Sequence, residues 1–116
     1  MLGKWVVAKE IKGENDDLRQ MAITDFGGQI MVSAAGKCPD KLCRWGERKA
    51  SMTNGSIVTE NWDLSNTPAE KERGRTVSLS IVSNADGIEV TVHNHWQQDN
   101  GTAKDTYVPV QMRKAS

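Results

Sequence analysis

Hydrophobic residues recur at every second position in this chain, and this spacing constrains the fold more than any other feature. The clearest run is Ile88, Val90 and Val92, with Glu89 and Thr91 between them. Successive side chains of a β-strand point to opposite faces, so such a run buries one face and exposes the other. Five further stretches alternate in the same way: Trp5 to Val7, Met21 to Ile23, Ile30 to Ala34, Val77 to Ile81 and Val108 to Met112.

Residues that favour turns separate these runs. Segments rich in Gly, Asn and Asp occur at 25–28, 54–55 and 84–87. Asn-Gly, at 54–55, is a strong hairpin signal because both residues tolerate a positive φ angle. The pattern predicts eight strands, near residues 4–9, 18–24, 29–35, 47–52, 56–64, 75–83, 88–96 and 105–113.

Eight short sequential strands favour an all-β, antiparallel up-and-down barrel, because an even number lets the last strand pair with the first. Closure also removes the exposed edges through which sheets aggregate. A β-sandwich is the alternative architecture. The length of 116 residues fits one domain, spanning residues 1–116.

Two positions predict local irregularity in this barrel. Pro109 removes a backbone donor, so the last strand should be irregular there or lie at a seam. Glu60 is in register with Val58 and Trp62, which would turn it inward. An unpaired buried charge is costly, so we expect either a bulge at Glu60 or an inner face marked by Ile57.

The charge balance narrows the range of partners and compartments. The chain has 15 basic and 15 acidic residues, which argues against nucleic acid and an anionic membrane surface as partners. No apolar run approaches the roughly 20 residues that span a bilayer. No signal peptide is recognisable in residues 1–12, so we expect a cytoplasmic protein, or a secreted or periplasmic one if a leader preceded Met1.

Several segments together resemble a known family. The chain has G-K-W at 3–5, G-K-C-P-D-K-L-C-R-W-G at 36–46, R-T-V-S-L-S-I at 75–81, Tyr107, and M-R-K at 112–114. This pattern resembles a family of small, largely uncharacterised bacterial β-barrel proteins. Leu42 and Arg44 depart from it, since both stand where the family has an acidic residue. The resemblance implies a small barrel, often exported, and assigns no catalytic residue.

Cys38 and Cys43 permit three interpretations. They could form a local disulfide in an oxidising compartment, remain free structural thiols in the cytosol, or ligate zinc with two further ligands. The remaining ligands would have to be His93 and His95, the only histidines. We predict the disulfide if the domain works outside the cytosol.

The two histidines alternate with the inward residues of their strand. His93 and His95 share one face, which suits a metal, but their parity is opposite to that of Val90 and Val92. We therefore expect two exposed histidines, no metal site and no cofactor.

The tryptophans divide into two groups. Trp5, Trp62 and Trp96 share parity with the apolar faces of their strands, which predicts that all three lie in the core. Trp45 lies in the segment between the cysteines and the next strand. It would either plug one end of the barrel or anchor a partner at the surface.

No catalytic motif is present: there is no G-x-S-x-G, no H-E-x-x-H and no phosphate-binding glycine loop. The leading hypothesis is a non-enzymatic binding module for a protein, a glycan or a small molecule. The alternative is a lipocalin-like carrier, which would need a hollow interior with polar groups such as an inward Glu60. An enzyme using His93, His95 or Glu60 is a third class.

The predicted connections differ at the two ends of the barrel. Alternate connections of a meander share one end, and the longer ones, at 10–17, 36–46, 65–74 and 97–104, fall together. Binding residues gather on loops carried by a rigid scaffold. The sequence therefore predicts a partner site at the long-loop end, with Lys37, Lys41, Arg44 and Trp45.

Overall fold

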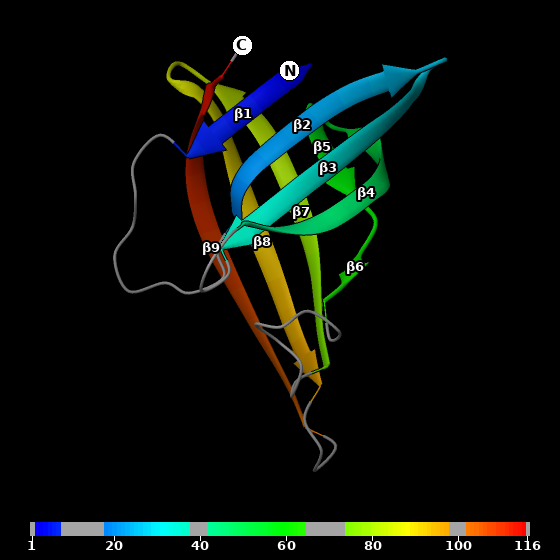
Figure 1. Cartoon of the computed structure of the whole chain (residues 1–116), viewed down its shortest axis with the longest axis vertical. Helices are drawn as coiled ribbons and strands as arrows, with labels where there is room; N and C mark the ends of the chain where they lie inside the picture. The colour runs from blue at the N-terminus through cyan, green and yellow to red at the C-terminus, as the bar shows by residue number, and fades with distance from the viewer. Residues whose placement is uncertain (1, 8–17, 38–41, 65–73, 98–101, 116) are drawn as a thin grey trace.

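The computed structural model describes residues 2–7, 18–37, 42–64, 74–97 and 102–115, and within them all regular structure is β (Figure 1). No helix that could span a membrane occurs in this part of the chain. The strands are β1 (Gly3–Val7), β2 (Leu18–Phe26), β3 (Gln29–Lys37), β4 (Leu42–Thr53), β5 (Ser56–Thr59), β6 (Trp62–Asp63), β7 (Gly74–Asn84), β8 (Gly87–Gln97) and β9 (Ala103–Lys114).

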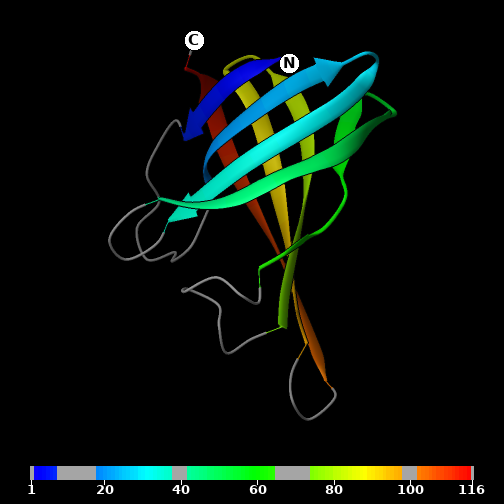
Figure 2. The same cartoon turned by 45° about the vertical axis from the view of Figure 1, so that its right-hand side comes forward.

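The strands form one closed antiparallel sheet. Their order is β5-β4-β3-β2-β1-β9-β8-β7-β6, and β5 also pairs with β7, which closes the circle. β5 and β6 are the two parts of the predicted fifth strand. The predicted eight-stranded up-and-down barrel is therefore confirmed over the alternative sandwich. In Figure 2, β2, β3 and β4 cross in front of β7, β8 and β9 at a steep angle, so the two halves enclose the interior.

A bulge interrupts the fifth strand at Glu60, as the sequence predicted. The step from Ile57 to Trp62 is one residue longer than the step between their partners on β7, Ile81 and Val77. Ile57 and Trp62 are both buried, whereas Glu60 is exposed. The extra residue thus switches the inward parity of the strand and keeps the carboxylate in solvent.

Tight turns join the strands at one end of the barrel. Asn54 and Gly55 have φ angles of 50° and 83°, and Gly27 and Gly28 have 59° and 93°. Two consecutive positive φ angles match the twist of paired strands, which explains the choice of Asn and Gly. The opposite end, where strands lead into 8–17, 38–41, 65–73 and 98–101, is called the long-loop end. The predicted long loops fall mainly on these residues, outside the described part of the chain.

Apolar side chains line most of the described interior of the barrel. Across β7, β8 and β9, the rows Leu79–Val92–Val108 and Ile81–Val90–Val110 follow directly from the register. Residues from every strand join them in one buried cluster, which includes Trp5, Leu18, Met21, Ile23, Val32, Trp62, Leu64, Val77, Ile88 and Met112. The alternating apolar pattern therefore identified the inner face correctly.

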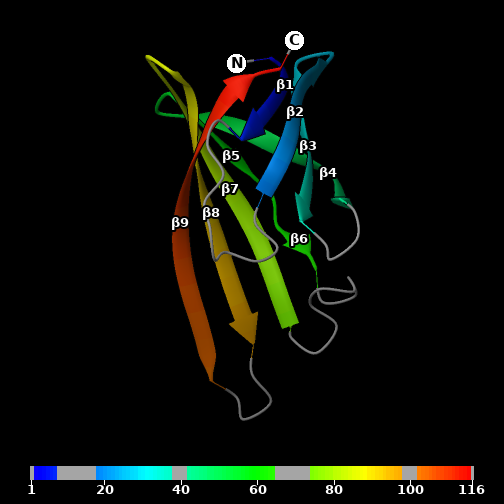
Figure 3. The same ribbon diagram turned by 60° about the vertical axis from the view of Figure 1, so that its left-hand side comes forward.

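Three strands reach further than the rest at the long-loop end. Figure 3 shows β7, β8 and β9 side by side, extending below the strands on the other side of the barrel. Trp96, near the end of β8, is half-buried, whereas its cross-strand partner Arg75 is buried. Placing Trp96 in the core was wrong, although its inward parity was right.

The segment after the cysteines was wrongly predicted to be a loop. β4 begins at Leu42, so Arg44 and Trp45 lie on a strand. A register shift between Ala34 and Ala35 on β3 lies opposite this stretch, and Gly46 has a φ of 97°. Only glycine adopts that conformation freely, so this irregularity allows pairing to continue past the predicted start of the strand.

Pro109 lies at the seam of the barrel, as predicted. It pairs with Thr91 on β8, whereas the described pairing of β9 with β1 covers only Met112 to Lys114. Proline has no backbone N–H. In the described part of the chain, Pro109 lies where β9 pairs only with β8, so hydrogen bonds are needed on one side of the strand only.

Candidate functional site

The inner face of β7, β8 and β9 changes from apolar to polar toward the long-loop end. Beyond the apolar rows, the register places Val77–Asn94–Thr106 in one row and Arg75–Trp96–Lys104 in the last. We call the polar and aromatic residues that meet here the mouth: Trp45, Arg75, Asn94, Trp96, Lys104 and Thr106.

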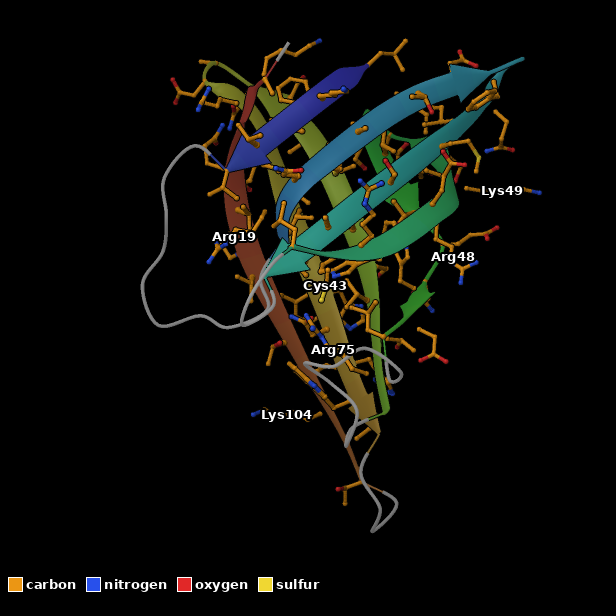
Figure 4. All side chains as sticks on the ribbon, in the orientation of Figure 1. Arg19, Cys43, Arg48, Lys49, Arg75 and Lys104 are labelled. Atoms are coloured by element: carbon orange, nitrogen blue, oxygen red, sulfur yellow. The ribbon has the colours of Figure 1, made fainter. Side chains whose placement is uncertain are left out.

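Arg75 is the fixed centre of the mouth. It is 2% exposed, and it donates from Nε and Nη2 to the side-chain oxygen of Asn94. Asn94 is buried as well, and its amide donates to Thr106 Oγ1 at 3.3 Å. In Figure 4 Arg75 lies below Cys43, and Lys104 lies lower still, toward the tips of β8 and β9. The strands thus hold one cation inside the barrel and present a second at its rim.

Tryptophan rings frame this arginine. Its Cζ lies 5.9 Å from the ring centroid of Trp45 and 5.7 Å from that of Trp96, within the range of cation–π attraction. Trp45 also meets Trp62 edge-on, with ring centroids 5.8 Å apart. A Cβ on Gly36 would lie 2.8 Å from the Trp45 indole, so only glycine there leaves room for the ring. Trp45, which the sequence leaves as either a plug or a surface anchor, is half-buried and packs against the core at this end of the barrel.

Of the four predicted partner-binding residues, the structure describes the side chains of Arg44 and Trp45, and these two lie on opposite faces of β4. Trp45 points into the barrel end, whereas Arg44, its neighbour on the strand, is exposed on the outer face. Lys37 ends β3 opposite Leu42, and its side chain is outside the described part. Lys41 lies outside the described residues altogether. The structure therefore separates Arg44 from Trp45 by the thickness of the sheet.

Arg44 instead borders an open depression of about 820 Å³ over β1 to β4. The floor carries small side chains, because Ala22 pairs with Ser33 across β2 and β3. Lys4 and Glu47 flank the same row on β1 and β4. Its border carries both signs of charge, with Lys4 and Arg44 positive and Glu47 negative, and nothing in its geometry specifies a ligand.

Cys43 is half-buried beside the mouth, and it is not a free thiol. Its predicted partner, Cys38, lies outside the described residues, so the pairing stays a prediction. A bond between them would tie the start of β4 to the end of β3.

In protein produced in an oxidising compartment, we expect Cys38 and Cys43 to be joined by a disulfide. Intact mass should then increase by two hydrogens on reduction, and an alkylating reagent should label neither cysteine beforehand. Two thiols that alkylate without reduction would contradict the prediction.

The histidines form a cluster that the sequence did not predict. His93 Nε2 and His95 Nδ1 each lie 2.9 Å from Asp105 Oδ1, on the outer face of β8 and β9. Tyr107 stacks on His93, with ring centroids 4.5 Å apart and planes at 8°. Among the described residues, no three or more His, Cys, Asp and Glu side chains are arranged to hold a metal ion. The cluster joins both histidines to a carboxylate, but on an exposed face rather than in a cleft.

Hydrogen bonds from His95 and then His93 lower the pKa of Asp105 below its ordinary value of 3.8. A lowered pKa in the folded state means that folding favours the ionised carboxylate. Its contribution to stability is present above the unfolded pKa, near pH 4, and is lost as the pH falls through the folded value.

We therefore expect the NMR titration midpoint of the Asp105 carboxyl group to lie below 3.8. Replacing His95 with alanine should raise this midpoint more than replacing His93, because the hydrogen bond from His95 is the larger cause. A midpoint at or above the ordinary value in the unmodified protein would contradict the assignment.

Sequence reasoning missed most of the mouth, although a signal was present. Arg75 has the inward parity of Val77 and Leu79, and Asn94 has that of Val90 and Val92. Polar residues at inward positions, close to the same barrel end, would have pointed to a polar site there.

No family model, curated protein or solved structure matches this chain, so the resemblance to the family of small bacterial β-barrel proteins stays a prediction drawn from its motifs.

Proposed function

We propose that this chain is a non-enzymatic binding module that takes a ligand at the mouth. The observation that carries the proposal is a buried arginine between two tryptophans at the long-loop end, where β7, β8 and β9 extend past their neighbours. Barrel ends are preferred ligand sites, and aromatic residues with arginine are enriched where proteins bind partners.

The mouth has features of a recognition site beyond composition. Asn94 and Thr106 fix the orientation of Arg75, so the polar centre is preorganised. Trp96 is half-buried, which leaves part of an aromatic ring accessible to a ligand. Rigid polar groups beside an accessible ring favour a small organic molecule over a large protein surface.

A lipocalin-like carrier is the second candidate, and it would share the same entrance. It needs an interior cavity with polar groups. Glu60 is exposed. Apolar side chains line the described interior from the tight-turn end to the row of Leu79, Val92 and Val108. These observations favour a ligand held at the mouth over one held deep in the barrel.

The proposal predicts where ligands bind and which tryptophan they need. In an NMR screen of sugars, organic acids, amines and nucleosides, ligand-induced shifts should fall on Arg75, Asn94 and Trp96. Replacing Trp96 with alanine should weaken binding about tenfold or more, equivalent to about 1.4 kcal/mol, while the barrel stays folded. Tyr107→Ala is the matched control, because Tyr107 is an exposed aromatic on the outer face of the same sheet.

Two results would count against the proposal. One is a screen in which no compound shifts the mouth residues. The other is a footprint at the tight turns, or on the face of His93 and Tyr107, with binding lost in Tyr107→Ala and kept in Trp96→Ala.

A further inference from the structure

The last row of the mouth places one tryptophan between two cations. Arg75 on β7 and Lys104 on β9 are the cross-strand partners of Trp96 on β8. Arg75 Cζ lies 5.7 Å and Lys104 Nζ 5.9 Å from the centroid of the Trp96 ring. Since the partners come from opposite neighbouring strands, the ring is approached from two sides by positive charge.

The two cations differ in how firmly they are held. Arg75 is buried, and its guanidinium is hydrogen-bonded to Asn94. Lys104 is exposed, and the contact described for its ammonium group is the Trp96 ring. An exposed cation–π contact is weak, so a ligand can displace Lys104 at little cost. Arg75 would stay in place beneath the ring.

The exposed charge of the described mouth, on Lys104, favours an anionic ligand. Both charged members of the mouth, Arg75 and Lys104, are positive. Asp105 follows Lys104 in sequence but faces the other side of the sheet, where it is bound to His93 and His95. Asp105 therefore lies on the opposite side of the sheet from the Lys104 ammonium group.

We propose that the ligand of the mouth is a planar organic anion, an aromatic ring that carries a carboxylate or a similar acid group. Its ring stacks on Trp96 in place of the Lys104 ammonium group, and its acid group forms an ion pair with the displaced ammonium. Offset stacking of two rings contributes attraction beyond that of the apolar area that it buries. This inference rests on the proposed function and names the chemical class that the mouth would recognise.

Three probes separate the parts of this proposal: 2-naphthoate, a planar anion; decanoate, a flexible anion; and naphthalen-2-ylmethylammonium, a planar cation. Each is titrated into the whole chain while the Trp96 indole N–H signal is followed by NMR. 2-Naphthoate should bind at the mouth at least tenfold more tightly than either of the other two. Its affinity should fall as salt is added, because the ion pair with Lys104 is exposed.

Variants of two lysines test the role of Lys104. Lys104→Ala should weaken 2-naphthoate binding three- to tenfold, and Lys104→Arg should restore most of it. Lys114→Ala is the matched control, since Lys114 Nζ lies 5.1 Å from the ring centroid of another tryptophan, Trp5, at the tight-turn end. That variant should leave binding unchanged. Both lysines are exposed, so neither replacement should unfold the barrel.

The outcomes distinguish this inference from the proposed function. Decanoate or the ammonium probe binding the mouth as tightly as 2-naphthoate overturns the ligand class but leaves the mouth as a binding site. If all three probes fail but another compound of the screen shifts Arg75 and Trp96, the ligand class is also overturned and the mouth remains a binding site. An unchanged affinity in Lys104→Ala overturns the role of the lysine. Binding of 2-naphthoate away from the mouth, with no ligand found at it, overturns both proposals.

Discussion

Replacing Trp62 with alanine is expected to lower the free energy of unfolding by about 3–5 kcal/mol, the usual cost of deleting a buried tryptophan. Trp62 is 1% exposed and belongs to the apolar core. Its Nε1–H donates to the backbone carbonyl of Gly46 at 3.1 Å, and its ring meets Trp45. Alanine would leave a cavity and remove this hydrogen bond to the irregular part of β4.

Chemical denaturation followed by circular dichroism measures this loss. Trp62→Phe should cost less, since it keeps most of the ring volume and loses the indole N–H. Trp96→Ala serves as the control, because Trp96 lies outside the core and its replacement should cost clearly less than that of Trp62. Equal losses for Trp62 and Trp96 would show that the core does not depend on Trp62 in the way proposed.

Replacing Arg75 with alanine is expected to destabilise the barrel by about 3 kcal/mol, through a cavity and a broken buried hydrogen-bond network. Asn94 Oδ1 accepts from both Nε and Nη2 of Arg75, so it would lose both donors at once. Trp45 and Trp96 would lose the guanidinium between them. The unfolding free energy of the single variant measures the combined effect.

A double replacement tests whether Arg75 and Asn94 stabilise the barrel as a pair. When both partners of a buried polar pair become apolar groups of similar shape, the change in stability is often small. We therefore expect Arg75→Met combined with Asn94→Leu to cost less stability than the sum of the two single replacements, because the two side chains are hydrogen-bonded to each other. A double variant that costs the full sum would show that the two residues are not coupled.

Local patterns were sufficient for most of the fold. The alternation of apolar and polar residues assigned the inner faces of the long strands, and Asn54-Gly55 marked a turn with two positive φ angles. The bulge at Glu60 was also predictable, because a buried unpaired carboxylate costs more than an extra residue in a strand. These predictions succeeded because each depends on residues that are neighbours in sequence.

The errors share a different physical origin. Trp96 has inward parity but is half-buried, at the end where β7, β8 and β9 extend past the other strands. β4 starts at Leu42 because β3 pairs with it past an irregularity at Gly46. The alternation of apolar residues within one strand does not indicate how far its neighbours extend. It also does not indicate whether pairing continues past a glycine such as Gly46.

The sequence by itself determined the strand class, the turns, the inward parity and the neutral overall charge, because these depend on side-chain chemistry and nearest neighbours. Only the tertiary structure decided which residues meet at the mouth. Arg75, Asn94 and Thr106 are far apart in the chain, and they come together through the registers of β7 with β8 and β8 with β9. Closure of the barrel then brings Trp45, from the opposite side, against Arg75. The candidate site depends on register and closure, which are set by the packing of the whole core.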